Sequence, residues 1–202
     1  MKIDNGFGSH KFVLEHMINI LENKTVLELG SGDYSTKLIH DIVGGVNGKI
    51  ITIDTDSNWL NRYMDLKNDN HDLIHYDIDK LHEFFDNDTN DWGLVFVDSG
   101  TWDSRVMAME KYAKTADYII LHDCDYFPNY NIIGKTIKPV NINEKDMGIR
   151  DYGTDMFKNW VEFSLDDWFT YGSWMPPTLV GSNKHNLDNL KIDNMIITNK
   201  SK

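Results

Sequence analysis

Residues 25–39, TVLELGSGDYSTKLI, decide the fold of this chain. A short apolar run carries one acid, Glu28, and breaks at the turn Gly30-Ser31-Gly32, after which the apolar residues have helical spacing. This pattern is typical of a buried strand, a tight glycine turn and the start of a helix. Such a turn directs backbone N–H groups and the positive end of a helix towards a ligand.

The same pattern recurs along the chain. Apolar runs at residues 49–54, 73–78, 92–98 and 117–123 each end at or near an acid, with helical segments between them. Strands that alternate with helices predict a parallel sheet with helices on both faces. The carboxyl ends of such strands meet at one edge, where ligands bind. We therefore expect this edge to gather five acids: Glu28, Asp54, Asp77, Asp98 and Asp123.

Beyond residue 126 the pattern changes. Residues 160–165 and 178–181 read as strands joined in antiparallel fashion, and residues 195–197 as an edge strand or a frayed end. Aromatic residues gathered between 168 and 174 either line an acceptor site or pack over the sheet edge. We expect a single domain, residues 1–202, made of an N-terminal helix (1–23), a cofactor-binding core (24–125) and a substrate-side region with the last strands (126–202).

Composition narrows the class of partner. The 202 residues carry a formal net charge of -12, so a nucleic acid, whose phosphates are also negative, is not expected as a partner. The single cysteine, Cys124, excludes an intrachain disulfide. Because no apolar run has the length of a membrane span, we expect no membrane association and a cytoplasmic location. The oligomeric state is left open.

Several residues have two readings. Asp54 lies about 20 residues beyond the glycine turn, where an acid accepts ribose hydroxyls. Asp77 either accepts a hydrogen bond from an adenine amino group, with Ile78 against the ring, or caps the next helix. Ser9 and His10 read as a helix cap and turn in preference to ligand contacts. Arg105 could grip an acidic sugar, pair with Asp98 or lie on a helix surface.

The motifs VLELGSG (26–32), ITID (51–54) and HYDI (75–78) together resemble those of class I S-adenosylmethionine-dependent methyltransferases. The segment 91–130 is also similar to the DUF579 glucuronoxylan methyltransferase-like proteins. The resemblance implies a Rossmann-like α/β fold, with a mostly parallel seven-stranded sheet and an antiparallel C-terminal hairpin. It also implies S-adenosylmethionine as cofactor. The implied cofactor-binding residues are Glu28, Gly30, Ser31, Gly32, Ser35, Thr36, Asp54, Thr55, Asp77, Ile78 and Asp98.

Asp98 and Asp123 follow consecutive strands, so the fold should place their carboxylates side by side. Two close carboxylates either share a proton or hold a cation, and oxygen ligands suit Mg²⁺ or Mn²⁺. We therefore expect Asp98 to act as a base or a metal ligand, with Asp123 and His122 as partners and Arg105 beside them. Cys124 stands where catechol-type O-methyltransferases, which use such metal acids, usually have asparagine.

The expected activity is O-methylation of a sugar or another small hydroxylated acceptor. One alternative is an enzyme that cleaves S-adenosylmethionine. Another is a nicotinamide-dependent oxidoreductase or a non-catalytic nucleotide-binding module. Ser35 stands where the dinucleotide fingerprint has its third glycine, which disfavours a nicotinamide cofactor.

Overall fold

The computed structural model describes residues 8–124, 156–165 and 176–201. One eight-stranded sheet forms its centre, with the strand order β3-β2-β1-β4-β5-β7-β6-β8. The strands are β1 (Thr25–Leu29), β2 (Lys49–Asp54), β3 (His71–His75), β4 (Leu94–Val97), β5 (Tyr118–His122), β6 (Asn159–Leu165), β7 (Thr178–Ser182) and β8 (Met195–Lys200). The helices are α1 (Lys11–Ile20), α2 (Thr36–Gly44), α3 (Ser57–Leu60), α4 (Leu81–Asn87) and α5 (Trp102–Tyr112), with short 3-10 helices η2 (Asn61–Leu66) and η3 (Ile78–Lys80).

Strands β1 to β5 are parallel, and β1 lies between β2 and β4. Successive side chains of a strand point to opposite faces of the sheet, and here both faces are covered. In β1, Leu27 and Leu29 join the core on one face, and Val26 joins the core on the other. The continuous apolar runs in the sequence are therefore buried central strands, as predicted.

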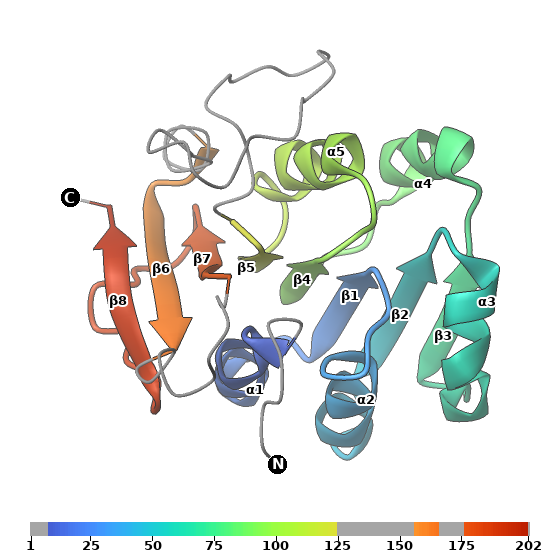
Figure 1. Ribbon diagram of the computed structural model, residues 1–202, viewed down its shortest axis with the longest axis horizontal. Coiled ribbons are helices and arrows are strands. Elements are labelled where there is room, and N and C mark those ends of the chain that lie inside the picture. Colours follow the sequence, from blue (N-terminus) through green and yellow to red (C-terminus); the bar gives the residue numbers. More distant parts are fainter. Residues whose placement is uncertain (1–7, 125–155, 166–175, 202) are drawn as a thin grey trace.

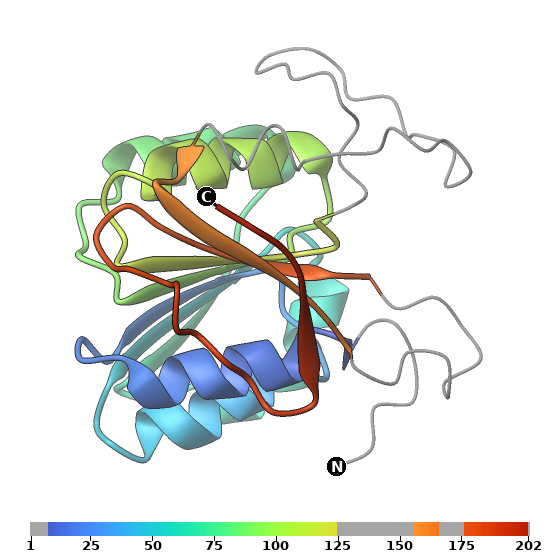
Figure 2. The ribbon, with the colours of Figure 1, turned by 90° about the vertical axis from the view of Figure 1, so that its left-hand side faces the viewer.

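Helices cover both faces of the parallel half (Figures 1 and 2). On one face α4 and α5 pack over a core that includes Phe85, Trp92 and Tyr112. On the other face α1 and α2 pack over a core that includes Met17 and Phe96. Because the strands that these helices connect are parallel, their carboxyl ends lie at one edge of the sheet.

The strands of the C-terminal part pair in antiparallel fashion. Strand β7 pairs antiparallel with β5, and β6 lies antiparallel to both β7 and β8. The antiparallel hairpin is thus confirmed, and the sheet has the predicted Rossmann-like character. The sheet has eight strands where seven were expected, because residues 195–197 belong to the edge strand β8. The aromatic residues 168–174 lie outside the described part of the chain.

Three local predictions differ from the structure. The strand expected at 73–78 is β3 at His71–His75, so Asp77 lies beyond its end and Ile78 opens η3. The helical segment expected between the runs 49–54 and 73–78 is split between α3 and η2. Ser9 does not cap the first helix: α1 starts at Lys11 with His10 at the cap position and no side-chain cap bond. Within the described residues, no helix is both long and apolar enough to cross a membrane.

Candidate functional site

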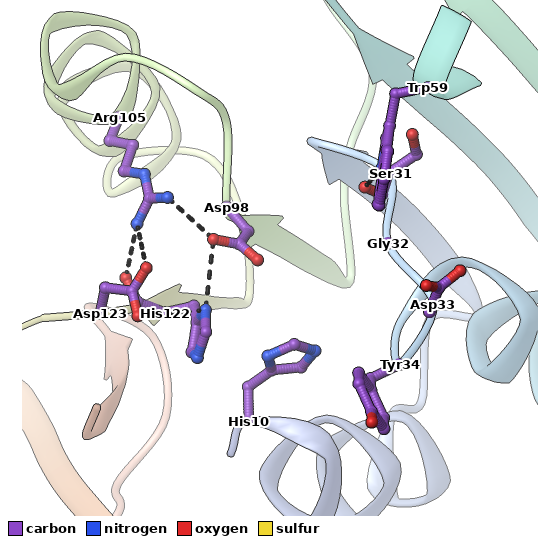
Figure 3. A pocket seen from close by; sticks show the side chains of 10 residues that line it. All are labelled: His10, Ser31, Gly32, Asp33, Tyr34, Trp59, Asp98, Arg105, His122 and Asp123. Atoms are coloured by element: carbon purple, nitrogen blue, oxygen red, sulfur yellow. Dashed lines mark hydrogen bonds and ion pairs between the residues drawn. The ribbon is translucent and has the colours of Figure 1, made fainter. Parts of the chain in front are cut away.

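A pocket of about 330 Å³ opens at the carboxyl edge of the parallel strands (Figure 3). Its volume lies at the lower end of the ~300–1,000 Å³ range of small-molecule sites. One side is the glycine turn after β1, and the opposite side is a polar cluster at the ends of β4 and β5 (Figure 3). The lining residues are His10, Ser31, Gly32, Asp33, Tyr34, Trp59, Asp98, Arg105, His122 and Asp123.

The glycine turn is pressed against the end of β4. Gly30 has φ of 95°, and a Cβ there would lie 2.4 Å from the carbonyl oxygen of Asp98. A residue with a side chain would be strained by the conformation and would also collide with the backbone. Glycine is therefore required for the turn and the polar cluster to share one pocket.

The N–H groups of this turn are already satisfied within the chain. Gly30 donates to the carbonyl oxygen of Ile53, Ser31 to Asp54 Oδ2 and Gly32 to Thr36 Oγ1, each at 2.8 Å. The expectation that these groups face a ligand is therefore wrong for this arrangement. A pyrophosphate would find none of these three N–H groups free, because one backbone carbonyl and two side chains accept from them.

Asp54 holds the turn in place. Its Oδ2 also accepts a hydrogen bond from Ser31 Oγ at 2.6 Å, and its Oδ1 accepts from the Asp56 N–H at 2.9 Å. Together with Gly30 and Thr55, Asp54 lines a small hollow of about 10 Å³ beside the main pocket. This is the side on which a ribose was expected. Asp77 and Ile78 line neither cavity, and the Asp77 carboxylate lies 3.7 Å from Lys80 Nζ.

Glu28 lies behind the turn and does not line the pocket. Its carboxylate accepts hydrogen bonds from Thr36 Oγ1 at 3.1 Å and Thr52 Oγ1 at 2.7 Å. Burial raises the pKa of Glu28 to about 7, against the opposing effect of hydrogen bonds from Ser35 and the two threonines. Glu28, Ser35 and Thr36 therefore support the turn from the side away from the pocket.

A wall that the sequence did not reveal closes one side of the pocket. Trp59 Nε1 donates to the carbonyl oxygen of Ser31 at 2.5 Å, and the Arg62 guanidinium lies 4.0 Å from the centre of the indole ring. Arg62 also pairs with Asp33 at 2.8 Å, and the Tyr63 hydroxyl donates to the same carboxylate at 2.6 Å. Trp59 and Tyr63 were not among the predicted site residues, since helical spacing does not show which face meets a pocket.

The predicted residues Asp98, Arg105, His122 and Asp123 do come together. Arg105 is buried, and Figure 3 shows its guanidinium reaching towards both carboxylates. It donates to Asp98 Oδ1 at 2.9 Å and to the carbonyl oxygens of Ser99 at 2.7 Å and His122 at 2.9 Å, and it lies 3.4 Å from Asp123 Oδ2. The surface-helix reading of Arg105 is wrong, and the pairing with Asp98 is confirmed.

Charge and burial set the protonation of this cluster. Burial acts to raise the pKa of Asp98, but the charges of His122 and Arg105 outweigh it and the pKa is lowered. Burial acts to lower the pKa of His122, but the charges of Asp98 and Asp123 raise it overall. Burial raises the pKa of Asp123, opposed by the charge of His122. Asp98 is thus the carboxylate that stays ionised most readily.

The arrangement does not support Asp98 and Asp123 as a two-carboxylate magnesium site. The Arg105 guanidinium contacts both carboxylates and already supplies the positive charge between them. Among the described residues, the group of His, Cys, Asp and Glu side chains with metal-ligand spacing is His10, Asp98 and His122. The sequence favoured a turn over a ligand contact for His10, because its approach to β5 is a long-range contact with no local signal.

No family model matches the chain, and no curated protein does either. Solved structures do resemble it. A putative O-methyltransferase from Klebsiella pneumoniae is 16% identical with a TM-score of 0.60, over 86% of this chain and 80% of that one. The O-methyltransferase TomG from Streptomyces achromogenes, involved in tomaymycin synthesis and solved in complex with S-adenosylmethionine, is 13% identical with a TM-score of 0.57, over 86% and 79%.

The chain has the Rossmann-like methyltransferase fold. Fibrillarin from Aeropyrum pernix, solved with natively bound S-adenosylmethionine, has it as well, at 14% identity and a TM-score of 0.52 over 85% of this chain and 72% of that one. Identities this low establish the methyltransferase fold alone, so the chemistry has to be argued from the pocket.

Proposed function

We propose that this protein is an S-adenosylmethionine-dependent O-methyltransferase acting on a small hydroxylated acceptor. The observation that carries the proposal is the charge of the pocket beside the glycine turn. Three carboxylates, those of Asp33, Asp98 and Asp123, line it against the one guanidinium of Arg105, and the N–H groups of the turn are used internally. Such a pocket favours a cationic ligand over a pyrophosphate. It therefore favours S-adenosylmethionine, which carries a sulfonium and an ammonium group, over a nicotinamide dinucleotide.

The residues present fit that cofactor. Asp54, anchored to Ser31, is the acid that would accept the ribose hydroxyls, and the indole of Trp59 supplies an apolar wall beside the turn. Ile78 is exposed just past β3 and lines neither cavity, so its place beside the adenine stays a prediction. When bound, S-adenosylmethionine supplies a methyl group already activated on sulfur.

The polar cluster would prepare the acceptor. Asp98, whose pKa is lowered, is ionised at neutral pH and can accept the hydrogen bond of an acceptor hydroxyl. Arg105 holds the orientation of this carboxylate through its contact at 2.9 Å. As the acceptor oxygen bonds to the methyl carbon, the carbon–sulfur bond breaks with its electron pair on sulfur. The hydroxyl proton would pass to Asp98. Alignment of this kind contributes roughly 7–11 kcal/mol in well-oriented reactions.

The acceptor class follows from the polarity of the pocket. Asp98, Asp123 and His122 offer hydrogen-bond partners for several hydroxyl groups, which supports a sugar or a similarly hydroxylated molecule. This agrees with the resemblance of segment 91–130 to the glucuronoxylan methyltransferase-like proteins. The proposal includes a cytoplasmic location and no nucleic-acid or membrane partner.

Isothermal titration of the purified protein with S-adenosylmethionine, S-adenosylhomocysteine and NAD tests the cofactor. We expect the first two to bind and NAD not to bind, and binding of NAD alone would overturn the proposal. Transfer of labelled methyl to a panel of hydroxylated acceptors then tests the chemistry, with Asp98→Asn expected to bind cofactor but lose turnover. Breakdown of S-adenosylmethionine without an acceptor would instead favour the cleaving enzyme.

A further inference from the structure

Three side chains of the polar cluster have the identity and spacing of a transition-metal site. One ligand atom each from His10, Asp98 and His122 lies within 4.8 Å of the other two. His122 Nδ1 and Asp98 Oδ1 are 3.3 Å apart. Two ligands on a tetrahedral zinc ion, with bonds near 2.0–2.1 Å, are about 3.3–3.4 Å apart. Asp98 and His122 therefore already have the separation of zinc ligands, and His10 is the side chain that would move inward.

His10 supplies an independent reason to expect a ligand. Both ring nitrogens are buried and lack a hydrogen-bond partner in the part of the chain that the structure describes. The ring is held by packing, with its centre 4.8 Å from that of Phe96. Its centre lies 4.4 Å from that of the His122 ring, which is beside it in Figure 3. Buried polar atoms are paired in the great majority of cases, and an unpaired one has a cost. A cation bound to one ring nitrogen would remove part of that cost.

The orientation of His122 points to the same position. The Ser9 hydroxyl donates its one proton to the Pro176 carbonyl oxygen at 2.8 Å, so in its 2.9 Å contact with His122 Nε2 it must accept. Nε2 therefore carries a proton, and Nδ1 is the nitrogen that faces Asp98. Nδ1 has no hydrogen bond to the described residues, although Asp98 Oδ1 lies 3.3 Å away and Asp123 Oδ1 3.5 Å away. Facing two carboxylates, Nδ1 needs a positive partner, which is either a second ring proton or a cation bound in its place.

The surrounding hydrogen bonds are those of a supported metal site. Histidine ligands commonly donate their second ring N–H to an oxygen, and ligating carboxylates are themselves hydrogen-bonded. Ser9 provides the first contact, and Arg105 provides the second by donating to Asp98 Oδ1. A carboxylate has about four lone-pair positions, so the Arg105 contact leaves room for a cation on Asp98. With His122 neutral, as a metal ligand must be, two carboxylates and one guanidinium leave one negative charge for a cation to balance.

We propose that His10, Asp98 and His122 form a binding site for a divalent first-row transition metal of the zinc class. Two imidazole nitrogens and one carboxylate oxygen suit zinc or iron(II) better than Mg²⁺, which prefers oxygen ligands. Three protein ligands leave a position open towards the pocket. A hydroxyl oxygen of the acceptor would bind there, and this last role alone rests on the proposed function.

Calorimetric titration of the chelator-treated protein with Zn²⁺ alone tests the site, and Co²⁺ adds a visible absorption band that reports the coordination. We expect one equivalent of Zn²⁺ to bind much more tightly than Mg²⁺. The His10→Phe variant keeps a ring against Phe96 and removes the unpaired nitrogens, so it should fold at least as stably as wild type. Its Zn²⁺ affinity should fall by more than about 100-fold, the upper end of the loss caused by removing an outer hydrogen-bond partner.

Two further variants define the outcome. Ser9→Ala, which removes the support of His122, should weaken Zn²⁺ binding by about 10–100-fold. His82→Phe, at an exposed position on α4, is the matched control and should leave binding unchanged. Absence of Zn²⁺ and Co²⁺ binding, or equal affinity in wild type and His10→Phe, would overturn the proposal. Because the titration contains no S-adenosylmethionine and no acceptor, its failure would leave the proposed methyl transfer standing, and failure of cofactor binding would leave the metal site standing.

Discussion

Replacing Glu28 with glutamine tests how burial of one carboxyl group controls stability beneath the glycine turn. Glu28 is fully buried in β1, and burial raises its pKa from 4.5 to about 7. In the unfolded chain this glutamate has an ordinary pKa, so the folded state holds the proton more tightly. The raised pKa therefore contributes stability to the folded state at every pH at which Glu28 is protonated in both the folded and the unfolded state.

The size and direction of the effect follow from the two pKa values. Below about pH 4.5 both states are protonated and the stabilising contribution is fully present. As the pH rises towards about 7, the unfolded state loses its proton first, and the contribution is lost through the folded-state pKa. The difference corresponds to about 3 kcal/mol at about 1.4 kcal/mol per pKa unit. A neutral glutamine at this position does not incur the loss.

Urea unfolding of wild type and Glu28→Gln at several values between pH 5 and pH 8 measures the effect. We expect the free energy of unfolding of the variant, relative to wild type, to rise by about 2.5 kcal/mol across this range, since part of the effect lies below pH 5. A change in hydrogen bonding to Thr36 or Thr52 adds a constant offset, which the comparison across pH removes. Glu83→Gln makes the same change of net charge at an exposed site and is the control. Parallel pH profiles for wild type and Glu28→Gln would refute the reasoning.

Three further substitutions test other parts of the structure. Gly30→Ala should destabilise the protein by at least about 1–3 kcal/mol, because φ is 95° and the new Cβ would meet the Asp98 backbone; an unchanged melting temperature would contradict this. Arg105→Met removes a buried guanidinium and leaves its carboxylates uncompensated, so denaturant unfolding should show a loss of about 3–5 kcal/mol, and a loss below about 1 kcal/mol would be inconsistent with a buried pair. Arg62→Ala should cost only about 0–1 kcal/mol, since the pair with Asp33 is 44% and 54% exposed; a larger loss on denaturant unfolding would show that the pair is structurally required.

The parallel core was predictable because its signal is local. Strands β1, β2, β4 and β5 are continuous apolar runs, as burial on both faces of a parallel sheet requires. Strand β3 was placed too late because it is an edge strand, and its pattern of buried and exposed residues is weaker. The Ser9 cap was wrong because the hydroxyl is used in contacts with His122 and Pro176, far away in the sequence.

The candidate site was predictable in part for a related reason. Asp98, His122 and Asp123 follow strands whose ends the topology brings together, so their meeting could be inferred from the order of elements. Trp59 and His10 come from segments before or between strands, and only packing turns them into the pocket. The role of Arg105 was left open because periodicity does not distinguish a buried cation from an exposed one.

The sequence by itself determined the order of strands and helices, the glycine turn and the row of acids at the strand ends. These features depend on residue type and spacing, which act over a few neighbouring positions. Tertiary structure alone decided which groups face one another. It satisfied the turn N–H groups internally and placed Arg105 between two carboxylates. It also buried His10 beside His122, because side chains more than a hundred positions apart meet only after the sheet has formed.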